Sequence, residues 1–427
     1  MSELLIRGGR EISGFHAVSG NKNAALPMLA AALMTDEEVV LENLPIIRDV
    51  ATTIDLLRDL GADAEIDEKA HTAHIHARNI TKTAPLPDLC AKARASILFA
   101  GPLLARAGKA TIATSGGDFI GRRRIDTHVS GLQALGATFD ESAGHSFTAP
   151  EDGLKGRRIV LDEASVTATE NIVMAAATAK GETSIYNAAC EPHVQDLCHL
   201  LVAMGARIEG IGTNLIRIEG VDRLHGAHAK IGPDYIDAGS YIAASLVTGG
   251  ALSLGPIRAA EFEILERHFS KFGVKWTISG DTLILPGGQK PEIRYDLGDA
   301  IPKVEDGIWP SFPSDLMSIL IVLATQTKGT TLFFEKMFES RLYFVDHLIG
   351  MGAHIVLCDP HRVVVAGPSK LHGARVTSPD IRAGISLLIA ALAAEGETRI
   401  LGAESIDRGY ERVEERFGEL GASIVRL

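Results

Sequence analysis

Apolar and polar positions along the chain form a pattern that repeats six times. Each copy carries an apolar residue followed by Gly and a small apolar residue, and then by alternating positions. The glycines lie 75, 69, 68, 79 and 69 residues apart, close to one sixth of the 427-residue chain. Such a constant spacing predicts a fold built from one repeated supersecondary unit. The six fragments are Leu60-Gly61-Ala62, Leu135-Gly136-Ala137, Met204-Gly205-Ala206, Phe272-Gly273-Val274, Met351-Gly352-Ala353 and Leu420-Gly421-Ala422.

Each copy is predicted to contain two helices of different character. An amphipathic stretch, such as 52–60 or 411–420, precedes the glycine, and a short alternating strand such as 206–209 follows it. Glycine directly after the last helical turn is the expected C-terminal cap. A more apolar helix lies 34 to 42 residues upstream of each glycine. These apolar helices are expected to begin near Asn23, Arg94, Asn171, Gly239, Asp315 and Arg382.

The repeat predicts an α/β fold with two lobes. Six copies of a helix–strand–helix–strand–strand unit (a βαβαββ-type repeat) are too large to share one core, so we expect two groups of three. A turn-rich crossing at 231–234 marks the midpoint. We therefore expect a first lobe over 22–232, including a mobile glycine loop at 115–124, and a second lobe over 1–21 plus 233–427. A cleft between two similar lobes is a natural ligand site.

Composition narrows the class of protein. With 46% hydrophobic and 22% charged residues the chain is not disordered. Its longest apolar runs, near 316–324 and 386–394, are about nine residues, against the roughly twenty that a membrane span needs. The start of the chain lacks the pattern of a signal peptide, and four cysteines without a CxxC pair form no disulfide framework. We expect a cytoplasmic protein that is a monomer or a weak homo-oligomer.

The charged residues point to a local anion site. A net charge of −12 argues against a nucleic-acid binder, yet three arginines follow a glycine pair at 122–124. Arg94 and Arg382 are predicted at helix starts, where the helix dipole opposes a cation. If equivalent ends of the copies meet, a set of cations suited to phosphate and carboxylate ligands would converge, with Asp118 and Asp315 available for proton transfer. The set is Lys22, Arg94, Arg123, Arg341, Arg382 and Arg408.

The other motifs do not indicate a cofactor-binding site. Gly210-Ile211-Gly212 lacks the third glycine of a dinucleotide fingerprint, and Gly108-Lys109 lacks the upstream glycine of a P-loop. His71, His74 and His76 lie in a short alternating stretch and are interpreted as exposed strand-edge residues rather than metal ligands. We expect neither a metal nor a prosthetic group.

Several of these segments together resemble the enolpyruvyl transferase family over essentially the whole chain. The family fold is two inside-out α/β barrels, each with three copies of the unit, in agreement with the repeat count. The matching segments are 19–27, Arg94-Ala95-Ser96, 101–106, 116–121, Phe312-Pro313-Ser314-Asp315, Phe338-Glu339-Ser340-Arg341 and 407–412.

The resemblance implies a reaction and roles for its residues. Enolpyruvyl would pass from phosphoenolpyruvate to the 3′-hydroxyl of UDP-N-acetylglucosamine, with release of phosphate, in the first committed step of peptidoglycan precursor synthesis. Lys22, Arg123 and Arg408 would hold phosphoenolpyruvate, Asn23 and Asp315 the sugar, and Asp315 would act as base. Asp118 takes the position of the proton donor. The substrate-binding set implied is Lys22, Asn23, Arg94, Arg123, Arg124, Ile125, Asp126, Thr127, Glu163, Ala164, Ser165, Val166, Asp315, Met337, Arg341, Arg382 and Arg408.

Three positions depart from the family pattern, and three other functions compete. Most members carry Cys where this chain has Asp118, which implies resistance to the thiol-directed antibiotic fosfomycin. Glu163 stands where Lys is frequent, and Arg124 where Pro is common. The alternatives are a transferase acting on shikimate 3-phosphate, one acting on another nucleotide in specialised metabolism, and a non-catalytic nucleotide-sugar sensor.

Overall fold

The computed structural model describes residues 2–118, 120–142 and 144–427, so Phe119 of the predicted glycine loop lies outside the described residues. The chain divides into two compact units. Unit 1 consists of Met1–Ser19, Asp118–Arg122 and Pro233–Leu427, and unit 2 of Gly20–Gly117 and Arg123–Gly232. Residues 118–122 therefore group with unit 1, whereas the sequence analysis placed the whole glycine loop in the first lobe. None of the helices found in the described part of the chain has the length and apolar character needed to cross a membrane.

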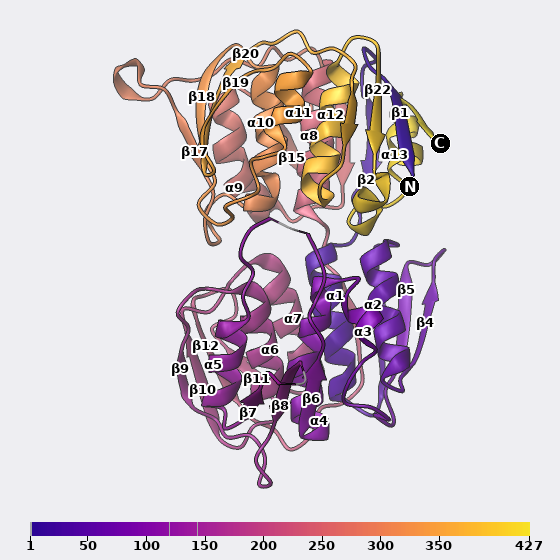
Figure 1. Cartoon of the computed structure of the whole chain (residues 1–427), viewed down its shortest axis with the longest axis vertical. Coiled ribbons are helices and arrows are strands. Elements are labelled where there is room, and N and C mark those ends of the chain that lie inside the picture. Colours follow the sequence, from indigo (N-terminus) through magenta and orange to yellow (C-terminus); the bar gives the residue numbers. More distant parts are fainter. Residues whose placement is uncertain (1, 119, 143) are drawn as a thin grey trace. The chain divides into compact units, whose positions relative to one another are not determined.

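Unit 2 holds the first three copies of the repeat, coloured indigo to magenta in Figure 1. The first contains α1 (Lys22–Ala31), η1 (Ala32–Met34), β3 (Glu38–Glu42), α2 (Arg48–Asp59), β4 (Asp63–Asp67) and β5 (Thr72–His76). The second contains α3 (Pro87–Cys90), η2 (Arg94–Phe99), α4 (Ala100–Ala107), β6 (Lys109–Ile112), α5 (Asp126–Ala134), β7 (Thr138–Asp140) and β8 (His145–Thr148). The third contains β9 (Arg158–Val160), α6 (Val166–Ala176), β10 (Glu182–Tyr186), α7 (Pro192–Ala203), β11 (Arg207–Glu209), β12 (Leu215–Glu219) and β13 (Ala227–Lys230).

Unit 1 holds the other three copies and the N-terminal strands β1 (Glu3–Arg7) and β2 (Gly14–Ala17). The fourth copy contains α8 (Tyr235–Thr248), β14 (Leu252–Gly255), α9 (Ala259–Phe269), η3 (Ser270–Phe272), β15 (Thr277–Ser279) and β16 (Thr282–Leu285). The fifth contains η4 (Leu297–Asp299), β17 (Lys303–Glu305), η5 (Ser314–Leu316), α10 (Met317–Thr325), β18 (Gly329–Phe334), α11 (Val345–Gly350), β19 (His354–Asp359) and β20 (Arg362–Gly367). The sixth contains β21 (Arg375–Thr377), α12 (Ile381–Ala393), β22 (Glu397–Leu401), η6 (Ala403–Arg408), α13 (Val413–Glu419) and β23 (Ser423–Arg426). The predicted α/β class is confirmed. Five copies show the predicted order of elements, whereas in the sixth copy a single strand, β23, follows α13.

Each unit carries three small sheets. In unit 2 the strand orders are β13-β3-β5-β4, β6-β8-β7 and β11-β12-β10-β9, and in unit 1 they are β15-β16-β14-β2, β17-β18-β20-β19 and β21-β22-β1-β23. All the sheets except β6-β8-β7 combine antiparallel pairs with one parallel pair, for example β17 with β18. The N-terminal strand β1 lies between β22 and β23 and is antiparallel to both.

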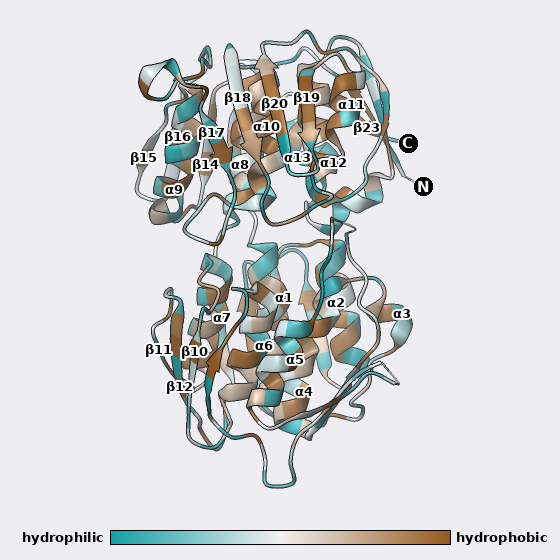
Figure 2. Ribbon diagram, turned by 60° about the vertical axis from the view of Figure 1, so that its left-hand side comes forward, coloured by the Kyte–Doolittle hydropathy of each residue, from teal (hydrophilic) through white to brown (hydrophobic). Residues whose placement is uncertain are grey.

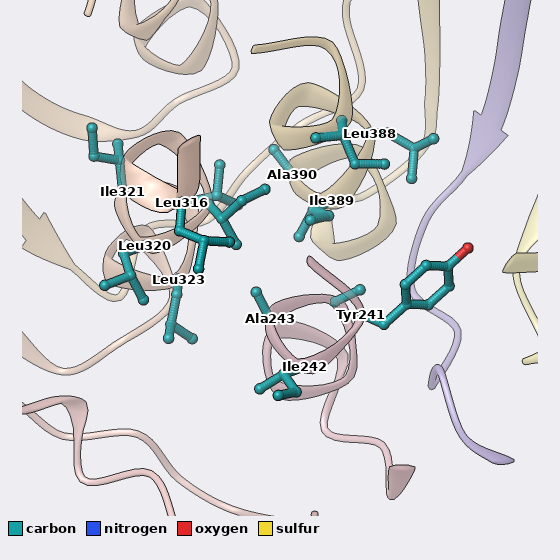
Figure 3. Close-up of a cluster of buried hydrophobic side chains, with 14 of the residues drawn as sticks. Tyr241, Ile242, Ala243, Leu316, Leu320, Ile321, Leu323, Leu388, Ile389 and Ala390 are labelled. Atoms are coloured by element: carbon teal, nitrogen blue, oxygen red, sulfur yellow. The ribbon is translucent and has the colours of Figure 1, made fainter. Parts of the chain in front are cut away.

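The most apolar helices form the core of unit 1. In Figure 1, α8, α10 and α12 lie inside the unit, with β17 to β20 on one side and β1 and β22 on the other. Every residue of α10 is buried, because a helix that is apolar on all sides is stable only when packed on all sides. Figure 3 shows side chains of these three helices meeting, among them Ile242, Leu320 and Ile389. By contrast, the hydropathy colouring of Figure 2 shows both polar and apolar residues on α2, at the periphery of unit 2.

The repeated glycines adopt the conformation that the pattern predicts. Each follows an amphipathic helix and has positive φ, between 71° and 104°, a region that residues with a Cβ rarely occupy. The preceding helix therefore ends at the same point in all six copies, and the chain turns into the next strand.

Two predicted helix starts were wrong. Helix α6 begins at Val166, not near Asn171, and α8 begins at Tyr235, not near Gly239. Their N-caps are Ser165 and Asp234, whose side chains accept hydrogen bonds from the first turn, and the predicted starts, Asn171 and Gly239, lie further along the buried helices.

The interpretation of the histidine stretch as a strand edge was also wrong. β5 is an inner strand between β3 and β4. His74 is exposed on the outer face of the sheet, where its Nδ1 lies 3.3 Å from Oε1 of Glu38. The edge position is taken by β4, which pairs with β5 through a hairpin.

Candidate active site

Asp315 lies between two buried arginines in unit 1. It is on η5, directly before the apolar helix α10, and a quarter of its side chain is exposed. Nη1 of Arg341 donates to its Oδ1 over 3.1 Å, and Nη2 of Arg382 donates to its Oδ2 over 2.9 Å. Two different cations therefore fix the two carboxylate oxygens, and the carboxylate is oriented rather than free to rotate.

Arg382 is stabilised at a helix start by neighbouring anions. It follows Asp380, the N-cap of α12, whose Oδ1 accepts from the backbone N of Arg382 and Ala383. Burial acts to lower the pKa of Arg382, but the charge of Asp315 and the nearby Tyr410 raise it above its ordinary value. Nη1 of Arg382 also donates to the Tyr410 hydroxyl over 3.2 Å. The unfavourable helix dipole is thus offset by direct ion pairing.

Asp118 forms an ion pair with Arg408 inside unit 1. The exposed fractions of the two side chains are 15% and 20%. The adjoining residues add backbone contacts: the N of Arg122 donates to Oε2 of Glu339 over 3.1 Å, and the N of Ser340 donates to the O of Ile120 over 3.1 Å. These contacts explain why 118–122 group with unit 1 while both flanking segments belong to unit 2.

Arg408 itself sits at the end of η6, beside an acidic partner network. Its neighbour Asp407 accepts two hydrogen bonds from Arg426, which also binds Glu414. These hydrogen bonds hold the backbone at the end of η6, and so hold the backbone of Arg408.

Lys22 begins α1 in unit 2 and is paired with Asp49. Nζ of Lys22 lies 2.8 Å from Oδ2 of Asp49, and both side chains are more than nine-tenths buried. The N-cap Asn21 accepts from the N of Ala24 through its side chain, so the helix start that carries Lys22 and Asn23 is closed by a regular cap. Asn23 is half-buried in the first turn.

Arg94 and Arg123 lie side by side in unit 2. Nη2 of Arg94 donates to the backbone O of Arg123 over 2.5 Å. Burial and the charge of Arg123 lower the pKa of Arg94 to about 10. Such crowding of two cations favours an anionic ligand at this point, since the ligand would relieve their repulsion.

The remaining predicted contacts follow at the starts of α5 and α6. Oγ1 of Thr127 donates to Oε1 of Glu163 over 3.3 Å, and Ser165 caps α6. One residue further along, Nε2 of His128 lies 3.0 Å from Oγ1 of Thr167, and its Nδ1 lies 3.0 Å from Nδ2 of Asn171. Ile125 and Val166 are half-buried beside these residues, and Ala164 is buried. Hydrogen bonds therefore join the start of α5 to the segment that leads into α6.

His128 is a residue that the sequence analysis missed. It is fully buried, and burial with the charges of Arg94 and His145 lowers its pKa to about 3. The ring is therefore neutral at physiological pH, one nitrogen donating and the other accepting. Its only signal in the sequence was its place directly after Thr127.

Arg124 and Met337 differ from the other predicted residues by their exposure. Arg124 and Asp126 form a mutual ion pair on the surface, with side chains 76% and 62% exposed. Met337 is 40% exposed on a turn after β18. Its backbone N donates to Oε1 of the buried Glu335 over 3.1 Å.

The structure thus gathers the predicted residues into separate groups. Asp118, Asp315, Arg341, Arg382 and Arg408 belong to unit 1 together with Met337, and the others belong to unit 2. Besides His128, the buried partners Asp49, Asp306 and Glu335 were missed, because acids far apart in the sequence give no periodic signal.

Comparison with known proteins gives matches over the full chain. The family model of EPSP synthase (3-phosphoshikimate 1-carboxyvinyltransferase) matches residues 6–417. The UDP-N-acetylglucosamine 1-carboxyvinyltransferase of Bradyrhizobium diazoefficiens is 51% identical over 425 residues, covering 100% of this chain and 98% of the relative. The protein of the same name from Treponema denticola is 50% identical and covers 99% of each chain.

Solved structures share the fold. The enolpyruvyl transferase NikO from Streptomyces tendae superposes with a TM-score of 0.89 at 25% identity, covering 100% of this chain and 99% of the other. An EPSP synthase from Acinetobacter baumannii gives a TM-score of 0.76 at 18% identity over 100% of both chains.

Proposed function

Because the chain belongs to the EPSP synthase family, we propose that it transfers enolpyruvyl from phosphoenolpyruvate to the 3′-hydroxyl of UDP-N-acetylglucosamine and releases phosphate. The step begins peptidoglycan precursor synthesis, and we place it in the cytoplasm. The observation that carries the proposal is the identity of about half over full length to relatives named for this acceptor.

Phosphoenolpyruvate is proposed to bind to Lys22, Arg123 and Arg408. Guanidinium groups pair bidentately with phosphate and carboxylate oxygens, and a phosphate dianion competes strongly with a single carboxylate. The phosphate would therefore displace Asp118 from Arg408. The released Asp118 carboxyl is then free to carry the proton that the methylene carbon needs.

Asp315 is proposed as the base for the acceptor hydroxyl. Arg341 and Arg382 each donate a hydrogen bond to one of its oxygens, so the carboxylate is already oriented when the substrate binds. Asn23 is proposed to hold the sugar, and its amide can both donate and accept. A base that is oriented before the substrate arrives requires little reorganisation during reaction.

The nucleotide is proposed to bind where hydrogen bonds join the starts of α5 and α6. Arg94 and the 123–127 segment supply cations and backbone groups, and 163–166 and Met337 supply further contacts. Because Glu163 accepts from Thr127, its backbone rather than its carboxylate is the contact that we expect. Arg124, exposed and paired with Asp126, serves through its backbone as well.

The bonds change in two steps. Asp118 gives its proton to the methylene carbon of phosphoenolpyruvate while the 3′-oxygen bonds to C2 and its own proton passes to Asp315. The Asp118 carboxylate then takes a proton back from the new methyl group, the C2–O bond to phosphate breaks, the double bond re-forms, and the proton on Asp315 passes to the released phosphate. The enzyme contributes positioning and general acid–base catalysis, and atoms balance without a cofactor.

The test is phosphate release from phosphoenolpyruvate with a panel of acceptors. We expect turnover with UDP-N-acetylglucosamine, a product heavier by the enolpyruvyl group, and none with shikimate 3-phosphate. Turnover only with another nucleotide would reassign the acceptor. No phosphate release with any acceptor, in a protein that still binds UDP-N-acetylglucosamine, would favour a sensor.

A further inference from the structure

Two buried carboxyl groups lie behind Asp315 in unit 1. Asp306 directly follows β17 and Glu335 directly follows β18. The two strands are parallel neighbours with Glu305 opposite Phe334, so the next residues in register are Asp306 and Glu335. Neither of the two residues is exposed to solvent. Two acids at adjacent strand ends are therefore enclosed together, which is costly for two full charges.

Glu335 binds the segments on either side of it. Oγ of Ser314, the residue before Asp315, lies 2.8 and 3.0 Å from the two carboxyl oxygens of Glu335. Oε1 also accepts from the backbone N of Met337 and Phe338 over 3.1 Å each. A single side chain thus fixes both the start of η5 and the turn that carries Met337.

The hydrogen bonds of Asp306 leave one oxygen for a proton. Oδ1 accepts from the backbone N of Lys336 over 2.5 Å. Oδ2 is buried and has no hydrogen-bond partner among the described residues. A proton shared with Glu335 would supply the missing donor, because a protonated carboxyl donates one hydrogen bond. Burial and the adjacent Asp306 carboxyl raise the pKa of Glu335 to about 8.

Arg341 lies between this pair and Asp315. Its Nη1 donates to Asp315, whereas its Nε is 4.0 Å from Oε2 of Glu335 and has no hydrogen-bond partner among the residues that the structure describes. The other groups around the pair hold their own partners. Nδ1 of His361 lies 2.6 Å from the backbone O of Glu335, Lys336 and Lys303 pair with Glu305, and Arg382 pairs with Asp315. Arg341 is thus the cation that responds when the charge of the pair changes.

We propose that Asp306 and Glu335 are positioning residues for the acceptor end of the active site: they share one proton, fix Ser314 and the Met337 turn, and leave Arg341 bound to Asp315. The inference rests on the proposed function of Asp315 and Met337. When the shared proton leaves to solvent, the pair gains a second negative charge and draws Nε of Arg341 toward Glu335. The contact between Arg341 and Asp315 weakens, and binding of the acceptor weakens with it.

The first test is the pH profile of three variants. In Glu335→Gln and Asp306→Asn, an amide donates the hydrogen bond and the pair keeps one negative charge at every pH. We expect kcat/KM for UDP-N-acetylglucosamine to fall about tenfold in the wild type between pH 7 and pH 9.5, mainly through KM, if one titrating group governs this limb. In both amide variants the fall should be less than about twofold. Glu170→Gln, which removes a buried carboxyl in unit 2, is the matched control and should keep the wild-type profile.

The second test does not require turnover. The carbonyl stretching band of a protonated carboxyl is separate from that of a carboxylate, so a difference infrared spectrum between wild type and Glu335→Gln at pH 7 isolates one buried acid. We expect this band to be lost in Glu335→Gln and in Asp306→Asn, and to be kept in Glu170→Gln apart from the band of Glu170 itself.

The outcomes separate the two proposals. Absence of turnover in the wild type overturns the proposed function, whereas the infrared band still decides whether the pair holds a proton. Unchanged alkaline limbs in both amide variants overturn the positioning role even when the enzyme is active. The absence of the infrared band at pH 7 overturns the shared proton.

Discussion

At the scale of single residues, arginines orient the two acids to which we assign proton transfer. Asp315 is held at both oxygens, by Arg341 and Arg382, whereas the cation paired with Asp118 among the described residues is Arg408. The first arrangement suits a group that stays in place, and the second suits one that is released when an anion binds. The two carboxylates therefore differ in the number of cations that hold them.

Replacement of Asp315 tests the base directly. Asp315→Ala should reduce kcat by about 10²- to 10⁴-fold, the usual contribution of a general base, while the protein stays folded. Phosphate release measures the loss, and circular dichroism checks the fold. Asp281→Ala, an exposed acid of the same unit, is the control. Near wild-type turnover in a folded Asp315→Ala protein would contradict the assignment.

We expect Asp118 to determine the response to fosfomycin, an epoxide that alkylates thiolates. A carboxylate is a poor nucleophile toward an epoxide, so wild-type turnover should be insensitive to the antibiotic. Asp118→Cys should keep activity and gain time-dependent inactivation, and Asp118→Asn, which has no carboxyl proton, should be nearly inactive. Progress curves with and without fosfomycin measure both effects.

Two results would count against this role of Asp118. Covalent inactivation of the wild type at low antibiotic concentration would mean that another nucleophile reacts. Normal turnover of Asp118→Asn would mean that a different group supplies the proton.

The sequence identified charged residues in the site better than their partners. Arg94, Arg382 and Asp315 stand out because a charge at the entry to an apolar helix is unusual. Glu335 and His128 do not, because each is a polar residue inside a segment whose pattern is explained by packing. Their roles appear only when the strand ends and helix starts are brought together.

At the scale of elements, the buried helix α6 carries an acid that the reaction does not use. Glu170 is 1% exposed, and its Oε1 has no hydrogen-bond partner in the described part of the chain. Burial and the charge of Glu191 raise the pKa of Glu170 well above 4.5. The folded state therefore binds this proton more tightly than the unfolded chain does.

This proton makes the stability of the protein depend on pH. The contribution of Glu170 to the free energy of unfolding is fully present below about pH 4.5 and is lost as the pH rises through the folded pKa. Glu170→Gln should therefore match the wild type near pH 4 and be more stable by about 1–3 kcal/mol at pH 8. Denaturant unfolding at both pH values measures the difference, with the exposed Glu151→Gln as control. A pH-independent effect would contradict the buried proton.

The glycine loop is the element expected to change on binding. Among the described residues, the pair between Asp118 and Arg408, backbone contacts to Glu339 and Ser340, and the buried side chain of Ile120 hold the loop, and a phosphate would compete for Arg408. A ligand shifts such an equilibrium only if it prefers one state. Backbone amides of 118–124 should exchange hydrogen more slowly with UDP-N-acetylglucosamine than without it, and those of the outer β4–β5 hairpin should not change. Equal exchange in the loop would exclude a lid.

Helix type was easier to predict than helix start. The amphipathic helices have a periodic polar face and a terminal glycine, so their ends could be located. The apolar helices contain scattered internal Asn, Ser and Gly residues, and two starts were placed on such positions, Asn171 and Gly239. The capping residues Ser165 and Asp234 were the better signal, because their side chains satisfy free backbone N–H groups.

At the scale of the whole molecule, the repeat predicted six copies, but it did not predict which strands the N-terminal segment pairs with. Most of unit 2 is inserted into unit 1, since the chain leaves unit 1 after Ser19, contributes the segment 118–122 to it, and returns for the remaining copies at Pro233. The N-terminal strand β1 completes the sheet of the sixth copy. A repeated local pattern does not predict which distant segments pair with each other.

This topology predicts the behaviour of fragments. Residues 233–427 alone lack β1, the inner partner of β22 and β23, and should aggregate or remain partly unfolded. Attaching residues 2–19 behind Leu427 through a linker of about four residues should restore cooperative unfolding, because β23 and β1 are antiparallel neighbours. Thermal melts followed by circular dichroism compare the two. A native-like transition in 233–427 alone would show that β1 is dispensable.

The position of β1 also orders events during synthesis. The ribosome makes this strand before its partners β22 and β23, which follow unit 2 and most of unit 1 along the chain. Unit 2 can fold while translation continues, as domains generally do. Until the sixth copy is made, β1 lacks both of these partners while it is joined to a folded unit 2. Slow translation or an early stop in the final copy would therefore leave an unpaired strand on an otherwise folded nascent chain, which makes this end the natural binding point for a chaperone.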